Sequence, residues 1–183
     1  MSEELLIHHC SPTLAGIKTG SLFSCVYHTK EQVRDTIRTL NQRLAAKGLR
    51  ILPLRFTERT VLIYVYRPHK LQADLSQDLA ADLLARHGYD SSRPALCLTR
   101  LAARLSGDEA FPHEIGLFLG YPPEDVCGFI ENRAEGCKCV GCWKVYGDEA
   151  QARRTFSQYK RCTEHYRHQW ANGTSLERLT VSS

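Results

Sequence analysis

The sequence has no hydrophobic run long enough to cross a membrane. Its longest apolar stretch, residues 61–66, falls far short of the roughly 20 residues that span a bilayer. The acidic pair Glu3-Glu4 leads into only three apolar residues, which does not resemble a signal peptide. We therefore expect a cytoplasmic chain without a membrane partner.

Short motifs that mark common enzyme classes are also missing. There is no glycine-rich phosphate loop, no G-x-S-x-G elbow and no H-E-x-x-H pair. The absence of these motifs disfavours nucleotide-dependent transfer and serine hydrolysis as functions. Flavin and haem pockets often carry no short motif, so both stay open.

Neither positive nor negative residues are in large excess. The formal net charge is +4, and the basic residues along helix faces are interrupted by acids. A dense basic stripe with interleaved aromatic residues, which nucleic-acid binding favours, is not seen. We expect a solvated surface and no nucleic-acid partner.

Hydrophobic periodicity predicts an α+β fold with a small, mostly antiparallel sheet packed by several helices. Two runs rich in aliphatic and aromatic residues, joined by a short polar link, predict a β-hairpin within residues 49–66. Helices are predicted at 29–48, 70–86 and 94–105, with a long C-terminal helix at 148–170. Because strands and helices do not alternate as in βαβ folds, the α+β class is favoured.

The remaining segments are shorter. Residues 111–132 predict two short helices, each opened by proline, at Pro112 and at Pro122-Pro123. Short strands are predicted at 5–8, 22–27 and 143–146. We expect residues 1–172 to form a single domain and residues 173–183 a loose C-terminal tail.

Cysteine, by contrast, is concentrated in one place. Cys137, Cys139 and Cys142 fall within six residues, and Cys162 follows nineteen residues after the last. In the cytoplasm such thiols are typical of metal ligands or reactive groups rather than of a disulfide framework. Cys139-x2-Cys142 suits a metal knuckle, and Cys162 with His165 would supply a second pair one helical turn apart.

Two kinds of metal centre fit this pattern. Zinc would take four of these five side chains as a closed ligand set. An iron–sulfur cluster usually takes four cysteines, and Cys127 or Cys10 would complete that set. A metal-free redox or nucleophilic role, and a structural role as small side chains in a tight turn, are the alternatives.

Cys10 is a separate candidate. The following Ser11-Pro12 indicates a helix entrance, with proline at the first helical position. A thiol there would feel the positive end of the helix dipole, which lowers its pKa. Lys18 and two neighbouring histidines would add positive charge or a general base. Cys10 and Lys18 are thus candidate catalytic residues, and a buried structural cysteine is the alternative.

His113 and Glu114 are the third group of candidate catalytic residues. Adjacent helical positions diverge by about 100°, so they are not expected to act as a dyad. One would face a site while the other caps the helix or pairs with an arginine. His113 would then serve as a metal ligand or proton carrier, the alternative being a satisfied core histidine.

Several stretches together resemble an uncharacterised bacterial family, domain of unknown function 3793. The resemblance spans nearly the whole chain and is carried by residues 9–18, 111–116, 119–122, 124–126 and 143–148. It implies a stand-alone domain from an anaerobic or facultative bacterium. It implies no catalytic assignment.

Three functions stay open. The first is thiol redox chemistry or iron or zinc handling, using Cys10 and the cysteines at 137–142 with Cys162, and with a redox protein or small molecule as partner. The second is a non-enzymatic binding or adaptor module with a structural zinc. The third is an enzyme on a small metabolite, with a pocket around His113 and Tyr121.

Overall fold

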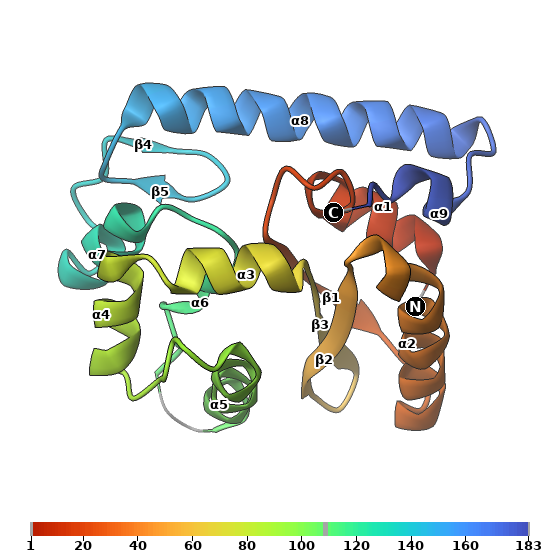
Figure 1. Cartoon of the computed structure of the whole chain (residues 1–183), viewed down its shortest axis with the longest axis horizontal. Coiled ribbons are helices and arrows are strands. Elements are labelled where there is room, and N and C mark those ends of the chain that lie inside the picture. Colours follow the sequence, from red (N-terminus) through yellow and green to blue (C-terminus); the bar gives the residue numbers. More distant parts are fainter. Residues whose placement is uncertain (1, 108–109, 183) are drawn as a thin grey trace. The chain divides into compact units, whose positions relative to one another are not determined.

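A computed structural model describes residues 2–107 and 110–182 (Figure 1). The chain forms two compact units: unit 1 holds residues 1–69 and 161–183, and unit 2 holds residues 70–160. The boundaries fall within helices α3 (Pro68–Leu75) and α8 (Glu149–Ala171). The single domain predicted for 1–172 stays a prediction. In the described part of the chain, every helix is too short or too polar to traverse a bilayer.

Unit 1 is built on a three-stranded antiparallel sheet. Strands β1 (Gly20–Val26), β2 (Arg50–Phe56) and β3 (Thr60–Tyr66) lie in the order β1-β3-β2. The β2–β3 pair confirms the predicted hairpin, and its register shifts between Pro53 and Arg55. Together with the helices and the long α8, this sheet confirms the α+β class (Figure 1).

Helix α1 (Glu3–Leu14) replaces the strand predicted at 5–8 and the helix entrance predicted at Cys10. Both predictions were wrong because the apolar residues follow a helical spacing: Leu6, Cys10 and Leu14 are all fully buried. Two acids in the first turn suit the positive end of the helix dipole. Pro12 lies near the helix end and does not interrupt it.

Helix α2 (Lys30–Leu44) forms as predicted and packs on β2. The Thr29 hydroxyl accepts a 3.2 Å hydrogen bond from the backbone N–H of Gln32, which caps the helix. After one 3-10 turn, η1 (Ala45–Lys47), Gly48 adopts the left-handed conformation at φ 71°. That is the stop expected from its sequence position.

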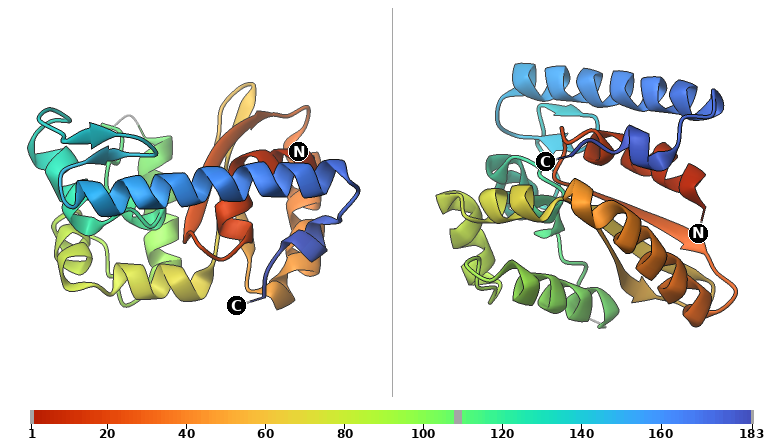
Figure 2. Two further views of the ribbon diagram at one scale, coloured as in Figure 1. Left: turned by 90° about the horizontal axis from the view of Figure 1, so that it is seen from above. Right: turned by 45° about the vertical axis from the view of Figure 1, so that its right-hand side comes forward.

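Residues 174–182 pack against the rest of unit 1 and are not a loose tail. They include helix α9 (Leu176–Leu179), which lies beside α1 (Figure 2). Leu176 is fully buried in the core of unit 1, and the backbone N–H of Val181 donates to the Leu14 carbonyl at 3.0 Å. The sequence did not predict this packing, because the tail is mostly polar and holds only two leucines.

Arg67 ties these segments together inside unit 1. Its side chain is 1% exposed and donates to the carbonyls of Thr13, Leu14 and Val181 at 2.7, 2.7 and 2.8 Å. A fourth bond reaches the Lys47 carbonyl at 3.2 Å. The carbonyls at the α1 C-terminus are acceptors that the helix itself leaves unsatisfied, so a cation suits this position.

Unit 2 is mostly helical. Its elements are most of α3, then α4 (Asp78–Arg86), α5 (Pro94–Ser106), α6 (Ile115–Phe118), α7 (Pro123–Glu131), β4 (Cys139–Val140) and β5 (Lys144–Val145), and the first part of α8. The helix predicted at 70–86 is two helices, α3 and α4. The break follows Ser76, whose hydroxyl donates to the Gln72 carbonyl at 2.6 Å, and Gln77 is extended.

Of the other helix starts predicted in unit 2, the one at Pro112 was wrong and those near Pro123 and Asp148 are confirmed. Pro123 opens α7 as predicted, whereas Pro112 precedes a turn and α6 begins only at Ile115. The Asp148 carboxylate accepts from the backbone N–H of Gln151 at 2.9 Å, which caps α8.

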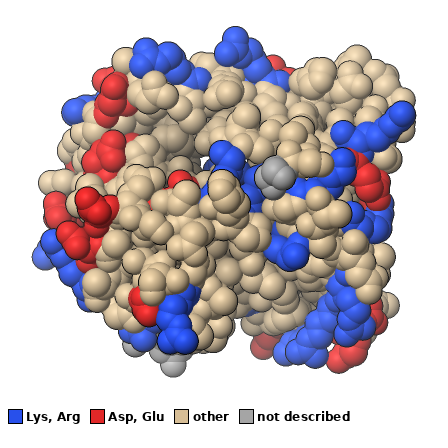
Figure 3. Space-filling model, in the orientation of Figure 1, with Lys and Arg blue, Asp and Glu red and all other residues tan. Residues whose placement is uncertain are grey.

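Charged side chains of both signs lie on the face of the molecule drawn in Figure 3. Groups of Lys and Arg side chains are separated there by uncharged surface and by Asp and Glu side chains (Figure 3). This distribution agrees with the mild net charge of +4. That the protein has no nucleic-acid partner stays a prediction.

Candidate functional site: an aromatic pocket in unit 2

A cavity of about 290 Å³ opens between the α6–α7 segment and the β4–β5 hairpin. Aromatic and apolar side chains dominate its wall, with an imidazole, a carboxylate and an ammonium group among them. The lining residues are His113, Ile115, Gly116, Tyr121, Asp125, Val126, Phe129, Val140, Gly141, Trp143 and Lys144. Such a wall is typical of small-molecule sites, which are mostly apolar with a few placed polar groups.

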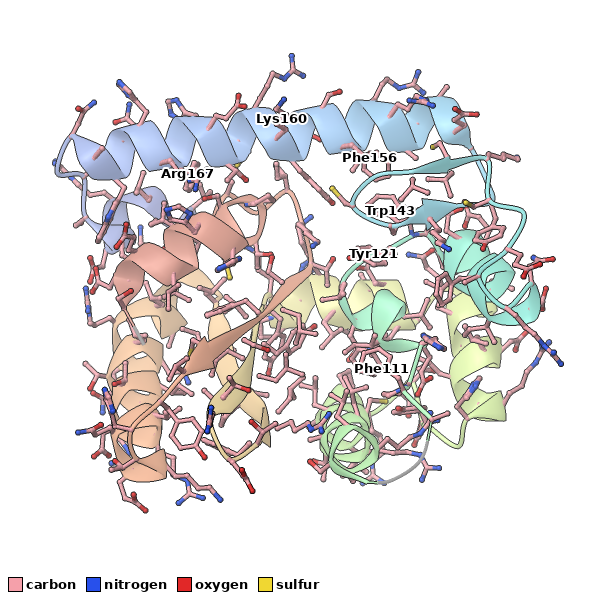
Figure 4. All side chains as sticks on the ribbon, turned by 180° about the vertical axis from the view of Figure 1, so that it is seen from behind. Phe111, Tyr121, Trp143, Phe156, Lys160 and Arg167 are labelled. Atoms are coloured by element: carbon pink, nitrogen blue, oxygen red, sulfur yellow. The ribbon has the colours of Figure 1, made fainter. Side chains whose placement is uncertain are left out.

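Three aromatic rings pack in sequence, and two of them, Tyr121 and Trp143, line the pocket. Tyr121 stacks on Trp143 with ring centroids 4.8 Å apart, and Trp143 meets Phe156 of α8 edge-on at 4.6 Å. Figure 4 shows these three side chains in a column that leads from the segment after α6 to α8. Rings held in this way present a flat, rigid surface.

Asp125 in the first turn of α7 holds the hairpin wall in place. Its buried carboxylate accepts hydrogen bonds from the indole nitrogen of Trp143 at 2.6 Å and from the backbone N–H groups of Tyr146 and Gly147 at 2.7 Å each. Hydrogen bonds to a charged acceptor are among the strongest in proteins. The orientation of Trp143 therefore depends on Asp125.

Gly141 allows the hairpin to approach α8 closely. A Cβ atom at this position would overlap the ring of Phe156. Only glycine lets the hairpin backbone lie against Phe156, the ring that supports Trp143.

The opposite side of the pocket is organised around Phe129 of α7. The His113 ring lies 5.0 Å from the Phe129 ring, and the Lys144 ammonium lies 5.9 Å above it. His113 is exposed, and Val140 at the hairpin edge is 69% exposed. Ligands would thus enter from solvent on this side.

Tyr121 has a fixed role in the wall. Its hydroxyl donates to the Cys142 carbonyl at 3.2 Å. Burial, and secondarily the nearby Cys142 thiol, raise the pKa of Tyr121 to about 12. The phenol therefore stays protonated near neutral pH and does not act as a base there.

Glu114 does not face the pocket, although His113 beside it does. The Glu114 carboxylate is 1% exposed, pairs with Arg104 of α5 and accepts a 2.7 Å hydrogen bond from the Tyr89 hydroxyl. The two neighbours diverge as expected for adjacent positions. Glu114 joins α5 to the segment before α6, which is a structural role.

Cys10 and Lys18 lie in unit 1, whereas the pocket belongs to unit 2. Cys10 is fully buried in the hydrophobic core. Burial raises the pKa of its thiol, and the charge of Lys18 offsets this only in part. An activated nucleophile needs a lowered pKa and access to solvent, and Cys10 has neither in this structure.

The predicted metal ligands are divided between the units. Cys137, Cys139 and Cys142 lie on and beside the β4–β5 hairpin in unit 2, while Cys162 and His165 lie on α8 in unit 1. Within residues 2–107 and 110–182, no group of three or more His, Cys, Asp and Glu side chains is arranged to hold a metal ion. Metal binding by these residues stays a prediction.

Sequence reasoning singles out His113 and Tyr121 but misses most of the pocket. It treats Trp143 only as part of a strand, and it does not mark Asp125, Phe129 or Lys144 as site residues. Asp125 at the third position of a proline-opened helix is a signal for a capping or anchoring carboxylate. Nothing in the sequence shows that its partner is eighteen residues away.

The chain belongs to the protein family of unknown function DUF3793. Residues 6–180 match this family, which confirms the resemblance seen in the sequence. No curated protein and no solved structure matches the chain. The family's description names no activity, and the geometry of the pocket therefore carries the functional argument.

Proposed function

We propose that the protein binds a small, flat organic molecule in the aromatic pocket of unit 2. The observation that carries this proposal is the cavity of about 290 Å³ walled by Tyr121, Trp143 and Phe129. A dry apolar cavity of about 150 Å³ already accommodates benzene. The pocket therefore has room for one or two rings, which would stack on its fixed aromatic walls.

Chemistry on such a ligand would be acid–base chemistry. Asp125 is engaged by three donors and Tyr121 keeps its proton, so neither suits proton transfer. His113 at the exposed side is a group of the usual type for this task. An enzyme acting on a small aromatic metabolite is thus the catalytic form of the same proposal.

Ligand-observed nuclear magnetic resonance with a panel of one- and two-ring compounds tests the proposal. We expect saturation transfer to several panel members in the wild-type protein and its loss in Phe129→Ala. The variant Trp170→Phe, whose tryptophan lies in unit 1, should keep the signal. If no member binds the wild-type protein, or if binding survives in Phe129→Ala, the pocket is not a ligand site.

A second candidate function, thiol or metal chemistry at the β4–β5 hairpin, is favoured by the exposure of its cysteines. Cys137 and Cys139 are half-buried and Cys142 is exposed, while Cys10, Cys25 and Cys97 are buried. Cys142 is therefore the thiol most within reach of a metal ion or an oxidant, while Cys127 and Cys162 are half-buried like Cys137 and Cys139. A cytoplasmic location, which keeps thiols reduced, belongs to this proposal.

Elemental analysis of anaerobically purified protein distinguishes a zinc site from an iron–sulfur cluster. About one zinc per chain supports a structural module, and iron with acid-labile sulfide supports a cluster. Brief alkylation followed by mass spectrometry should label Cys142 before Cys97. Equal labelling of the two cysteines, without bound metal, would contradict thiol chemistry confined to the hairpin.

A further inference from the structure

The pocket carries an ammonium group whose charge no carboxylate neutralises among residues 2–107 and 110–182. The Lys144 ammonium donates to the Ala134 carbonyl at 2.7 Å. An ammonium has three hydrogens, and this bond uses one of them. Lys144 is therefore a cation held at the wall of a mostly apolar cavity.

The loop that holds Lys144 is strained. Arg133 and Ala134 both adopt positive φ values, 50° and 65°, although neither is glycine. Non-glycine residues are uncommon in this region, because the Cβ atom crowds the backbone there. Backbone strain of this kind clusters at ligand-binding sites. We interpret the strained backbone as a means of orienting the Ala134 carbonyl toward the Lys144 ammonium.

His113 brings a second polar group, an imidazole, to the same ring. Its ring and the Lys144 ammonium both contact Phe129, although they come from segments about thirty residues apart. A flat ligand packed along Phe129 would thus place one edge within reach of both. The edge that they would stabilise carries negative charge.

The one acid in the wall does not offset this preference. Asp125 is buried, and its oxygens accept from three N–H donors. Those donors occupy its oxygens, whereas the partners of Lys144 in the described part of the chain, the Ala134 carbonyl and the Phe129 ring, are neutral. Lys144 is therefore the charged group of the wall that remains to pair with an anionic ligand.

From this we infer that the ligand is an aromatic carboxylate, with its ring against Trp143 and Phe129 and its carboxylate at Lys144 and His113. The inference rests on the proposed function and adds the chemical class of the ligand. Carboxylate recognition by an ammonium gives a reason for a lysine in a pocket built mostly from rings and aliphatic side chains.

Calorimetry with two matched probes tests the charge preference apart from the pocket itself. Naphthalene-2-carboxylate and naphthalene-2-carboxamide share a ring system and differ in charge. We expect the carboxylate to bind about tenfold more tightly, as one charge-assisted contact allows. In Lys144→Met the carboxylate should lose this advantage, while carboxamide binding stays the same.

Lys138→Met is the matched control. The Lys138 ammonium also donates to a backbone carbonyl near the hairpin, that of Gly147 at 2.6 Å, but Lys138 does not line the pocket. This variant should keep the full preference for the carboxylate. If both lysine variants lose it equally, general surface charge is responsible and the inference is wrong.

Salt dependence gives a second measurement on the wild-type protein, in case Lys144→Met does not fold. Raising the ionic strength should weaken carboxylate binding and leave carboxamide binding unchanged. Equal affinity for the two probes at low salt would overturn the inference but not the proposed function. Failure of both probes to bind would count against the proposed function itself.

Discussion

The indole nitrogen of Trp143 donates a 2.6 Å hydrogen bond to the buried carboxylate of Asp125. The same carboxylate accepts two backbone N–H groups that follow β5, so one side chain of α7 fixes a ring and the strand that carries it. This relationship links the stability of the hairpin to the shape of the pocket.

Replacement of Asp125 by asparagine should therefore weaken both the fold of unit 2 and ligand binding. The amide keeps one acceptor but brings two hydrogens toward existing donors. We expect a loss of about 2–3 kcal/mol in the free energy of unfolding, since hydrogen bonds to charged groups are each worth about 1.5–3 kcal/mol. Urea denaturation with near-ultraviolet circular dichroism measures the stability and the setting of Trp143 together.

Glu124→Gln is the matched control for Asp125→Asn. Glu124 precedes Asp125 in the first turn of α7 but is exposed, so its substitution should change stability by less than about 0.5 kcal/mol. Similar losses in the two variants would show that helix-dipole charge, and not the anchoring of Trp143, is the relevant interaction.

The buried pair of Arg104 and Glu114 predicts a larger effect. Glu114→Gln should cost about 3–5 kcal/mol, because it breaks an ion pair with Arg104 in which the Glu114 carboxylate is 1% exposed. The measurement is urea denaturation of the single variant and of Arg104→Met/Glu114→Leu. The double variant should recover part of the loss.

An exposed ion pair provides the comparison for Glu114→Gln. Arg38 and Asp35 lie 3.0 Å apart on α2 with both side chains in solvent. Asp35→Asn should cost less than about 1 kcal/mol. A cost for Glu114→Gln as small as this would mean that the Arg104 pair is solvated in solution.

Elements with a complete local signal could be predicted from the sequence. The helix capped by Thr29 and ended by Gly48 carries both boundary signals and an apolar stripe between them. The strand predicted at 5–8 was wrong because so short an apolar run suits a strand as well as a helix. Only the deeper burial of Cys10 and Leu14 shows which period applies.

The site was less predictable than the fold, and the physical reason is distance along the chain. A local motif points to His113 and Tyr121, but the wall opposite them comes from the β4–β5 hairpin. Trp143 reaches Asp125 across eighteen positions, and Lys144 reaches Ala134 in a loop where two residues other than glycine have positive φ values. Neither contact leaves a periodic pattern. The cysteines were chosen as candidate site residues only because they are dense in the sequence.

The buried C-terminal segment predicts a core-like response to mutation. Leu176→Ala should lower the free energy of unfolding by about 2–5 kcal/mol, since Leu176 is fully buried in the core of unit 1. Leu96→Ala is the control, because Leu96 is 51% exposed on α5. Equal and small losses in thermal or urea unfolding would restore the loose tail expected from the sequence.

Burial of Cys10 predicts a loss of stability at alkaline pH. Desolvation raises the pKa of this thiol above its ordinary value of about 9. Above that pH the unfolded chain releases the proton while the folded protein keeps it, so the folded state binds more protons and stability falls as pH rises. Each such group contributes about 1.4 kcal/mol per pH unit.

Cys10→Ala should reduce this slope by one proton between about pH 9 and 11, measured by urea denaturation at several pH values. Burial also raises the pKa values of Tyr89 and Tyr159, but these groups are present in every variant and cancel in the comparison. Leu6→Ala, on the same buried face of α1, should lower stability without changing the slope. If the slope of Cys10→Ala equals that of the wild-type protein, the thiol reaches solvent, and its role as a nucleophile is open again.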